Sequence, residues 1–233
     1  MHIIAVASQK GGSGKTTLAG HLAVAADRAN AGPVALVDTD PQGSLSEWWN
    51  ARKAETPLFA RTSTTRLGAD IERMRGLGIE LLFVDTPPAI EATIVEVIRL
   101  ADLVVIPARP SPHDLRAVGA TVELVERLAK PLVFVLNGAT PRARITNEAV
   151  MALSQHGTLA PVIVHHRTGF AASMIDGRTV MEISGDDRSS SEIVQLWDYI
   201  GRRLSRDFRT MLPSGLFTPP PQEVEAEPEK GAA

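Results

Sequence analysis

A glycine-rich segment with two lysines directly follows the first apolar run of the chain. Residues 8–17 read Ser-Gln-Lys-Gly-Gly-Ser-Gly-Lys-Thr-Thr, and residues 3–7 before them are all apolar. Glycines at this spacing let several backbone N–H groups point at one anion, while Lys15 adds a positive charge and the Thr16 hydroxyl can bind Mg²⁺. The segment therefore predicts a phosphate-binding loop between a strand and a helix.

The loop departs from the common phosphate-loop pattern in its first half. The usual pattern begins with glycine, where this chain has Gln9, and a second lysine, Lys10, precedes Lys15. One lysine is enough to hold the terminal phosphates of a nucleotide, so Lys10 requires an explanation of its own. The alternatives are a functional cation and a solvated loop lysine.

Two further polar motifs follow apolar runs that are predicted to be strands. Asp38 and Asp40 lie in Asp-Thr-Asp-Pro-Gln-Gly after residues 34–37, and Asp85 begins Asp-Thr-Pro-Pro after residues 81–84. Ligands of open α/β sheets bind beyond the carboxyl ends of the strands, so these motifs are expected to meet the phosphate loop. Asp85 is expected to hold Mg²⁺ through water. Asp38 is either a further metal or catalytic supporting residue or a helix-capping or structural carboxylate.

The elements that must position these motifs alternate along the chain. Apolar runs predict strands at residues 3–7, 34–37, 81–84, 103–106, 132–136 and 162–164. Helices are expected from residue 14 to a stop near residues 32–33, and within 45–53, 67–77, 90–100, 114–128, 147–155 and 190–212. Continuous apolar runs indicate strands that are buried on both faces. We therefore predict one doubly wound α/β domain over residues 1–212, with a mostly parallel sheet flanked by helices.

The composition excludes several classes of protein. The 233 residues are 44% hydrophobic and 22% charged with a formal net charge of −3, which is typical of a soluble globular chain. The absence of cysteine, of a leader and of an apolar stretch of about 20 residues predicts a cytoplasmic location. Residues 213–233 are rich in proline and glutamate, so they are expected to form a disordered tail.

Together these motifs resemble the ParA/MinD family of deviant Walker P-loop ATPases, and in particular its short ParA-like members. The resemblance rests on the three motifs above and extends over residues 1–212. Residues 107–115 are similar to the family's proline-rich segment, and Asn137 is similar to its asparagine near the adenine ring. The resemblance implies a homodimer on ATP, non-specific DNA binding by that dimer, and Mg²⁺-dependent hydrolysis stimulated by an adaptor or a ParB-like activator.

The resemblance also implies roles for individual residues. Lys10 would reach across the dimer to the partner's nucleotide, Lys15 would hold the β- and γ-phosphates, and Asp40 would position the attacking water. The nucleotide-binding residues would be Gly11, Gly12, Ser13, Gly14, Lys15, Thr16, Thr17 and Asn137. Thr16 would also be a metal ligand, and hydrolysis would be slow until a partner orders the site.

Arginines concentrate in the C-terminal third of the chain. They are Arg167, Arg178, Arg188, Arg202, Arg203, Arg206 and Arg209. Such a basic face can contact DNA phosphates without reading bases, although a solvated helix face has the same composition. Family members place DNA-contacting residues after the seventh strand and on the last helix, so the resemblance favours Arg167, Arg202 and Arg203. Two patches would bind DNA together only in the dimer, which would associate with the nucleoid when ATP is bound.

Three functions are compared. The first is a ParA-like ATPase that segregates or positions DNA or protein cargo. The second is a MinD-like ATPase that cycles on the membrane, for which residues 193–212 superficially fit an interfacial helix. The acidic tail after that helix would be repelled by anionic lipids, so no stable membrane anchor is expected. The third, a metabolic enzyme on the same scaffold, is disfavoured because the chain lacks cluster-bridging cysteines and length for a substrate domain.

Two aromatic pairs invite a functional interpretation and have a structural alternative. Trp48 and Trp49 are adjacent on a predicted helix, where they cannot both face the core. One of them is expected to be buried, and the other can lie at a dimer or partner surface. His165 and His166 have no spaced carboxylate or further histidine to complete a metal site, so they are expected to be structural.

Overall fold

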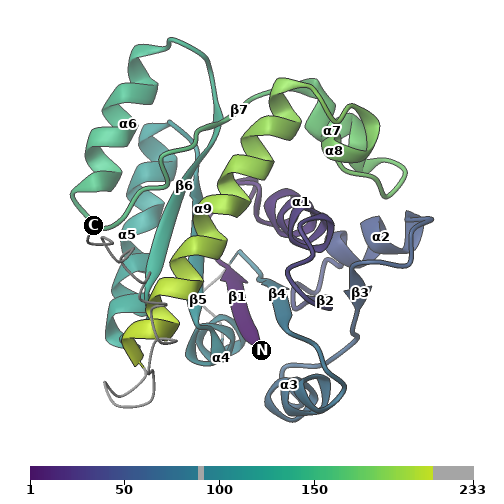
Figure 1. Cartoon of the computed structure of the whole chain (residues 1–233). Coiled ribbons are helices and arrows are strands. Elements are labelled where there is room, and N and C mark those ends of the chain that lie inside the picture. Colours follow the sequence, from purple (N-terminus) through teal and green to yellow (C-terminus); the bar gives the residue numbers. More distant parts are fainter. Residues whose placement is uncertain (89–91, 212–233) are drawn as a thin grey trace, which may run out of the picture.

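The phosphate loop and the two aspartate motifs lie at the ends of strands of one parallel sheet. The computed structural model describes residues 1–88 and 92–211, with side chains through residue 205. Within these residues seven strands run in the order β3-β2-β4-β1-β5-β6-β7, and all neighbours are parallel (Figure 1). The strands are β1 His2–Val6, β2 Val34–Asp38, β3 Leu58–Phe59, β4 Leu81–Asp85, β5 Leu103–Ala108, β6 Leu132–Ala139 and β7 Val164–His165. The predicted doubly wound α/β fold is confirmed.

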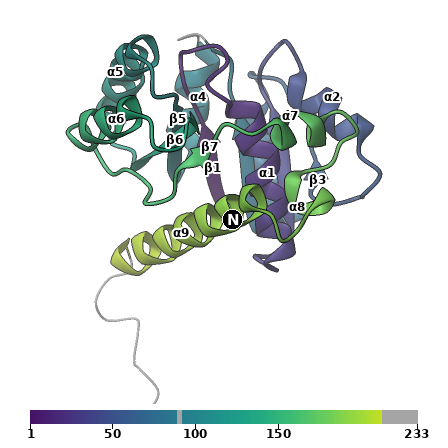
Figure 2. The same cartoon turned by 90° about the horizontal axis from the view of Figure 1, so that it is seen from above.

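Helices cover both faces of the sheet, as the view from above shows (Figure 2). One face carries α1, α2, α7, α8 and α9, and the other carries α3, α4, α5 and α6. The helices are α1 Lys15–Arg28, α2 Ser44–Ala51, α3 Leu67–Gly76, α4 Ala92–Leu100, α5 Pro112–Arg127, α6 Arg144–Ser154, α7 Thr168–Met174, α8 Val180–Ile183 and α9 Arg188–Met211. None of the described helices has the length and apolarity that crossing a lipid bilayer requires.

The central strand β1 contributes to two separate cores. Ile4 and Val6 pack with residues of α1 and α9, whereas Ile3 and Ala5 pack with residues of α4 and α5. Successive residues of a strand point to opposite faces, so a strand that is covered on both sides needs a continuous apolar run. This physical requirement explains why the apolar runs of the sequence locate the central strands of the sheet.

The apolar stripe of α9 faces the first of these cores. Leu196, Trp197, Ile200 and Leu204 are buried, and the Trp197 ring lies 6.0 Å from the Phe83 ring of β4, measured between centroids. The stripe is therefore covered by the sheet and by α1. In this arrangement α9 has no free apolar stripe over its residues 193–204 to offer to a membrane.

The short elements differ from the sequence prediction. The sequence predicts none of β3, α7 and α8, which have between two and seven residues. The strand expected at residues 162–164 is wrong in its bounds, because the chain pairs with β6 only at Val164 and His165. The tail expected at residues 213–233 lies outside the described residues, as do residues 90–91 of the helix expected at 90–100.

A fully buried histidine ties α1 to the segment that contains α7 and α8. His21 Nδ1 lies 2.8 Å from the Thr17 carbonyl oxygen, and the Val180 N–H donates to His21 Nε2 at 3.2 Å. Because Nε2 accepts, Nδ1 carries the proton that is donated to Thr17. Burial lowers the pKa of His21 to about 4, although the Thr17 carbonyl and Glu182 act in the opposite direction. The folded protein therefore keeps His21 neutral at neutral pH.

We expect His21 to lower the stability of the fold in mild acid. The unfolded chain takes up a proton at the ordinary histidine pKa of about 6.5, whereas the folded chain does so only near pH 4. The contribution of neutral His21 to the free energy of unfolding is thus fully present above pH 6.5 and is lost as the pH falls toward 4. At pH 5 the loss is about 2 kcal/mol. Asp85, whose pKa is raised by burial, changes stability in the opposite sense.

Urea unfolding of the wild type and of His21→Gln at pH 7 and pH 5 isolates this effect, because Asp85 is common to both proteins. The difference between their free energies of unfolding should shrink by about 2 kcal/mol on acidification. His156→Gln replaces an exposed histidine and should keep the wild-type pH profile. An equal difference at both pH values would show that His21 does not titrate in this way.

Candidate active site

The phosphate loop joins the end of β1 to the start of α1. Gly12 and Gly14 have φ values of 74° and 97°, which only glycine adopts readily. Asn137, from β6, donates from Nδ2 to the Ser13 carbonyl at 2.7 Å, and a Cβ on Gly14 would overlap that amide. The structure therefore places Asn137 against the loop, where its side chain fixes the loop backbone.

A buried carboxylate lies directly beneath the loop. Asp85 is 1% exposed, and its Oδ2 accepts from the Thr16 hydroxyl at 2.6 Å. Burial raises the pKa of Asp85 to about 7; Thr16 and Lys15 lower it, whereas Asp38 and Asp40 raise it further. Burial also lowers the pKa of Lys15, against the opposing effect of Asp85 and Asp40. Burial is thus the largest cause of both pKa shifts.

These oxygens fit Mg²⁺ bound together with phosphates. Among the described residues no three His, Cys, Asp or Glu side chains converge into a metal cage. Mg²⁺ rarely uses such a cage, because it keeps several waters and binds one or two protein oxygens plus phosphate oxygens. Thr16 and Asp85 supply a hydroxyl and a carboxylate of this hard-oxygen type, and a cation would relieve the raised pKa of Asp85.

The two other aspartates have different surroundings. Asp38 accepts from both the N–H and the hydroxyl of Ser46, at 2.9 and 3.0 Å, and from the Asp40 N–H at 3.0 Å. This is the geometry of a side chain that caps the start of α2, and Asp38 also pairs with Asp85 in the register of β2 and β4. The carboxylate of Asp40 accepts only from the Gln42 N–H among the described contacts, and Asp40 lines the cleft beside the phosphate loop.

The two loop lysines are placed differently. Lys15 is 7% exposed and donates from Nζ to the Lys10 carbonyl at 3.4 Å, so it lies under the loop. Lys10 has an exposed side chain, and its own N–H donates to the Ser8 hydroxyl at 3.3 Å. The backbone of Lys10 is therefore part of the loop, whereas its side chain is exposed to solvent.

A cleft of about 620 Å³ opens over the loop. Its walls come from the phosphate loop and α1, from Asp40 and α2, from Pro88 and Arg109, and from α7 with the adjoining Ile175. The loops after β1, β2, β4 and β5 thus meet at the carboxyl edge of the sheet, as expected for an open α/β fold. The volume suits a nucleotide-sized ligand.

Comparison with known proteins decides the family. The model of the CobQ/CobB/MinD/ParA nucleotide binding domain matches residues 4–180 of the chain. The chain belongs to this family. The matched range includes the phosphate loop, both aspartate motifs, Asn137 and every residue that lines the cleft. The predicted membership of the ParA/MinD family of nucleotide-binding ATPases is confirmed.

Relatives within this family cover most of the chain. The Maintenance of carboxysome distribution protein A of Gloeobacter kilaueensis is 32% identical over 224 residues, which are 89% of this chain and 95% of the relative. The protein of the same name from Halothiobacillus neapolitanus is 29% identical over 200 residues, or 81% and 91% of the two chains. The apo McdA structure from Cyanothece superimposes with a TM-score of 0.72 at 16% identity, over 86% of this chain and 100% of that one, and shows the shared fold.

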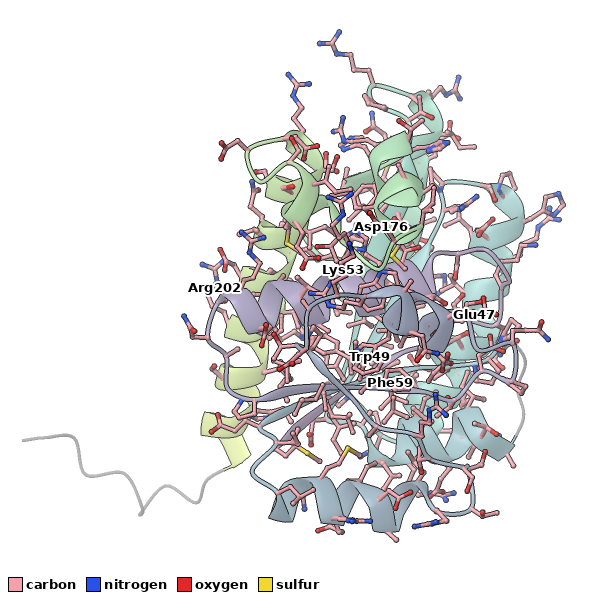
Figure 3. All side chains as sticks on the ribbon, turned by 90° about the vertical axis from the view of Figure 1, so that its right-hand side faces the viewer. Glu47, Trp49, Lys53, Phe59, Asp176 and Arg202 are labelled. Carbon is pink, nitrogen blue, oxygen red and sulfur yellow. The ribbon has the colours of Figure 1, made fainter. Side chains whose placement is uncertain are left out.

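The arginines that the sequence selects for DNA lie away from the cleft and differ among themselves. Arg202 is exposed on α9 (Figure 3), and Arg203 is half-buried with an Nε that has no partner among the described residues. Arg167 donates to Glu192 at 2.6 Å, and Glu192 also accepts from the N–H and ring of His165. Although burial raises the pKa of Glu192, these hydrogen bonds lower it overall. His165 thus has a structural role, and Arg167 forms an ion pair with Glu192.

Sequence reasoning missed the α7 wall and its contacts to α2. One local signal was available, because Thr179 and Glu182 form a capping box that marks the start of α8. Nothing in the sequence indicated that this segment lies over α2. Of the tryptophan pair, Trp48 is 3% exposed and lines the cleft, whereas Trp49 is half-buried and stacks near Phe59 with centroids 5.3 Å apart. The expectation that one indole is buried is confirmed.

Proposed function

We propose that the chain is a ParA-like ATPase that dimerises on ATP, binds DNA non-specifically and hydrolyses ATP under stimulation by an adaptor. The observation that carries the proposal is the cleft over the phosphate loop. Lys15, Thr16 and Asp40 line this cleft, Asp85 is buried beneath the loop, and the exposed Lys10 belongs to the same loop. Two relatives are named for maintaining carboxysome distribution, so a large protein assembly is the cargo class that we favour over a plasmid.

The proposed chemistry requires charge and position rather than covalent catalysis. The loop N–H groups and Lys15 would hold the β- and γ-phosphates, and Thr16 and Asp85 would hold Mg²⁺, directly and through water respectively. Bound Mg²⁺ would neutralise charge on the phosphate oxygens. Asp40, which is free of ion pairs in the described structure, would orient the attacking water. Lys10 of the partner subunit would add a cation as charge builds up on the transferred group.

The proposed DNA contacts require the dimer. Arg202 and Arg203 lie on α9, and a single patch of this size binds DNA weakly at physiological salt. Two patches on one dimer would act together, so the nucleotide state would set the DNA affinity. Arg167 would contribute only after leaving Glu192, because its guanidinium is paired in this structure. The membrane-cycling alternative would need the apolar stripe of α9, which the core already buries.

DNA co-sedimentation with ATP, with ADP and without nucleotide tests the proposed switch. We expect strong pelleting with ATP only, and a loss of that pelleting when Arg202 and Arg203 are both replaced by alanine. Arg73→Ala, on the opposite face of the sheet, is a matched exposed control. Equal pelleting in all three nucleotide conditions would falsify the switch. Flotation of the protein with anionic liposomes and ATP would favour the membrane-cycling alternative instead.

A further inference from the structure

The outer wall of the nucleotide cleft is apolar and comes from a distant part of the chain. Ala171 and Met174 of α7 and the adjoining Ile175 line the cleft together with the phosphate loop. Ile175 is 82% exposed, so it is available to a ligand. Apolar side chains offer nothing to phosphates, but they are the usual lining for a base and ribose. This wall therefore suits the nucleoside part of a nucleotide better than its phosphates.

One arginine fastens this wall to α2. Arg52, immediately after α2, is 3% exposed and donates from Nη1 to the Gly177 carbonyl at 2.8 Å. Its Nη1 and Nη2 donate to both oxygens of Glu182 at 2.9 and 2.6 Å, and its Nε donates to the Thr56 carbonyl at 2.9 Å. At least four of its five N–H donors are thus used. We call this set of contacts between Arg52, Gly177 and Glu182 the clamp.

The backbones on the two sides of the clamp are in direct contact. Gly177 has a φ of 77°, and a Cβ at this position would overlap the backbone of Arg52. Trp48 Nε1 donates to the Arg178 carbonyl at 3.1 Å, and the Arg52 guanidinium lies 5.4 Å from the Trp48 ring centroid. The loop between α7 and α8 therefore rests on α2 without space for a larger residue. In Figure 3, Lys53 and Asp176, the sequence neighbours of Arg52 and Gly177, lie on this side of the molecule.

Glu182 holds the other end of the clamp. Burial raises the pKa of Glu182, but the hydrogen bonds and charge of Arg52 lower it overall, so the pair is ionised. The Thr179 N–H and hydroxyl also donate to Glu182, at 2.8 and 2.9 Å. Helix α8 is fixed on α1 by further contacts of Val180 and Met181. The clamp consequently decides where the loop before α8 lies, and with it the C-terminal end of α7.

Helix α2 is in turn fixed to the aspartate motif. Its N-terminus is capped by Asp38, which also accepts from the Asp40 N–H. A rigid chain of contacts therefore runs from the loop with Asp40, through α2 and Arg52, to the apolar wall on the far side of the cleft. Because interiors are close-packed, a side chain at one end of such a chain keeps its position only while each link holds.

We propose that Arg52 is a positioning residue for the nucleotide site, which holds Met174 and Ile175 where they pack against the nucleoside part of the bound nucleotide. This inference rests on the proposed binding of ATP in the cleft. Arg52 itself does not touch the nucleotide. Breaking the clamp frees the wall and weakens the contacts of the nucleoside, while the phosphate loop keeps its own contacts to the phosphates.

Calorimetric titration of the full chain with MgATP and with Mg-tripolyphosphate separates these two sets of contacts. Glu182→Gln keeps the shape of the side chain but weakens the ion pair, and Arg52→Lys keeps the charge but cannot bridge Gly177 and Glu182 together. Both variants should raise the dissociation constant for MgATP about tenfold. Both should bind tripolyphosphate like the wild type. Arg178→Ala removes the exposed pair with Asp176 in the same loop, spares the Arg178 carbonyl, and should bind both ligands normally.

The other outcomes overturn the proposal. Wild-type affinity of both clamp variants for MgATP would show that the wall does not depend on Arg52. An equal loss for tripolyphosphate, or a similar loss in Arg178→Ala, would show a general loosening of the fold instead of a positioning role. Failure of the wild type itself to bind MgATP would contradict the proposed function, and therefore also the proposed role of the clamp. Melting curves of each variant establish that the titrated protein is folded.

Discussion

Replacing Lys15 by alanine is expected to raise the dissociation constant for MgATP by about a hundredfold. Lys15 is the buried cation under the phosphate loop, next to Asp85 and Asp40, and its burial lowers its pKa in the absence of an anion. A phosphate that arrives at the loop gains a charge-assisted hydrogen bond in a site with little water, where such bonds are strong. Alanine would leave the phosphates facing two carboxylates without this cation. Isothermal titration calorimetry measures the loss directly.

Lys10→Ala is the matched control for this prediction. It removes a lysine of the same loop whose side chain is exposed, in contrast to the buried Lys15. We expect it to bind MgATP with near wild-type affinity but to stay monomeric with a non-hydrolysable ATP analogue, as measured by light scattering. If Lys15→Ala binds MgATP as tightly as the wild type, the nucleotide is not held at this loop. If Lys10→Ala still dimerises, the proposed role of Lys10 as a cation for the partner subunit's nucleotide is wrong.

Replacing Asp40 by alanine is expected to slow ATP hydrolysis by at least about a hundredfold while MgATP still binds. Asp40 lines the cleft, and among the described contacts its carboxylate accepts only from the Gln42 N–H, so this carboxylate is available to water. An orienting group of this kind acts on the attacking water rather than on the ground-state nucleotide, so its loss appears in the rate and not in the affinity. The variant should also stay on DNA with ATP, because without hydrolysis the ATP-bound dimer does not dissociate.

Single-turnover phosphate release, together with DNA co-sedimentation, tests both parts of this expectation. Glu47→Ala is the matched control, since Glu47 is an exposed carboxylate that lines the same cleft from α2. It should hydrolyse ATP at the wild-type rate. Normal phosphate release by Asp40→Ala would exclude the water-orienting role. A slow variant that leaves DNA as fast as the wild type would instead disconnect hydrolysis from DNA release.

The motifs near the strand ends are the part of the site that could be predicted from the sequence. The apolar runs at residues 34–37 and 81–84 locate two strands that are buried on both faces, and parallel strands must bring their carboxyl ends to one edge. Asp38 and Asp85 accordingly pair in register on neighbouring strands. Such positions follow from chain order and from sheet geometry, and they need no knowledge of long-range packing.

Contacts between segments that are distant in the sequence could not be predicted, and the reason is again physical. The pairing of Arg167 with Glu192 and the clamp between Arg52 and Glu182 join residues that no local period or motif relates. Short elements such as β7 bury few side chains, so their patterns carry little signal and their bounds were wrong. Arg167 is an example, because its position after the last strand gives no indication of its ion pair with Glu192 of α9.

The sequence by itself determined the fold class, the family and the identity of the phosphate loop, because these depend on apolar runs and on glycine and lysine spacing that act locally. Only the tertiary structure decided which charges are compensated. It placed Asp38 on the start of α2, left Asp40 at the cleft, and brought the loop after α7 onto α2, so that α7 completes the wall of the cleft. The availability of a charged group depends on every neighbour that folding brings to it, and those neighbours come from all parts of the chain.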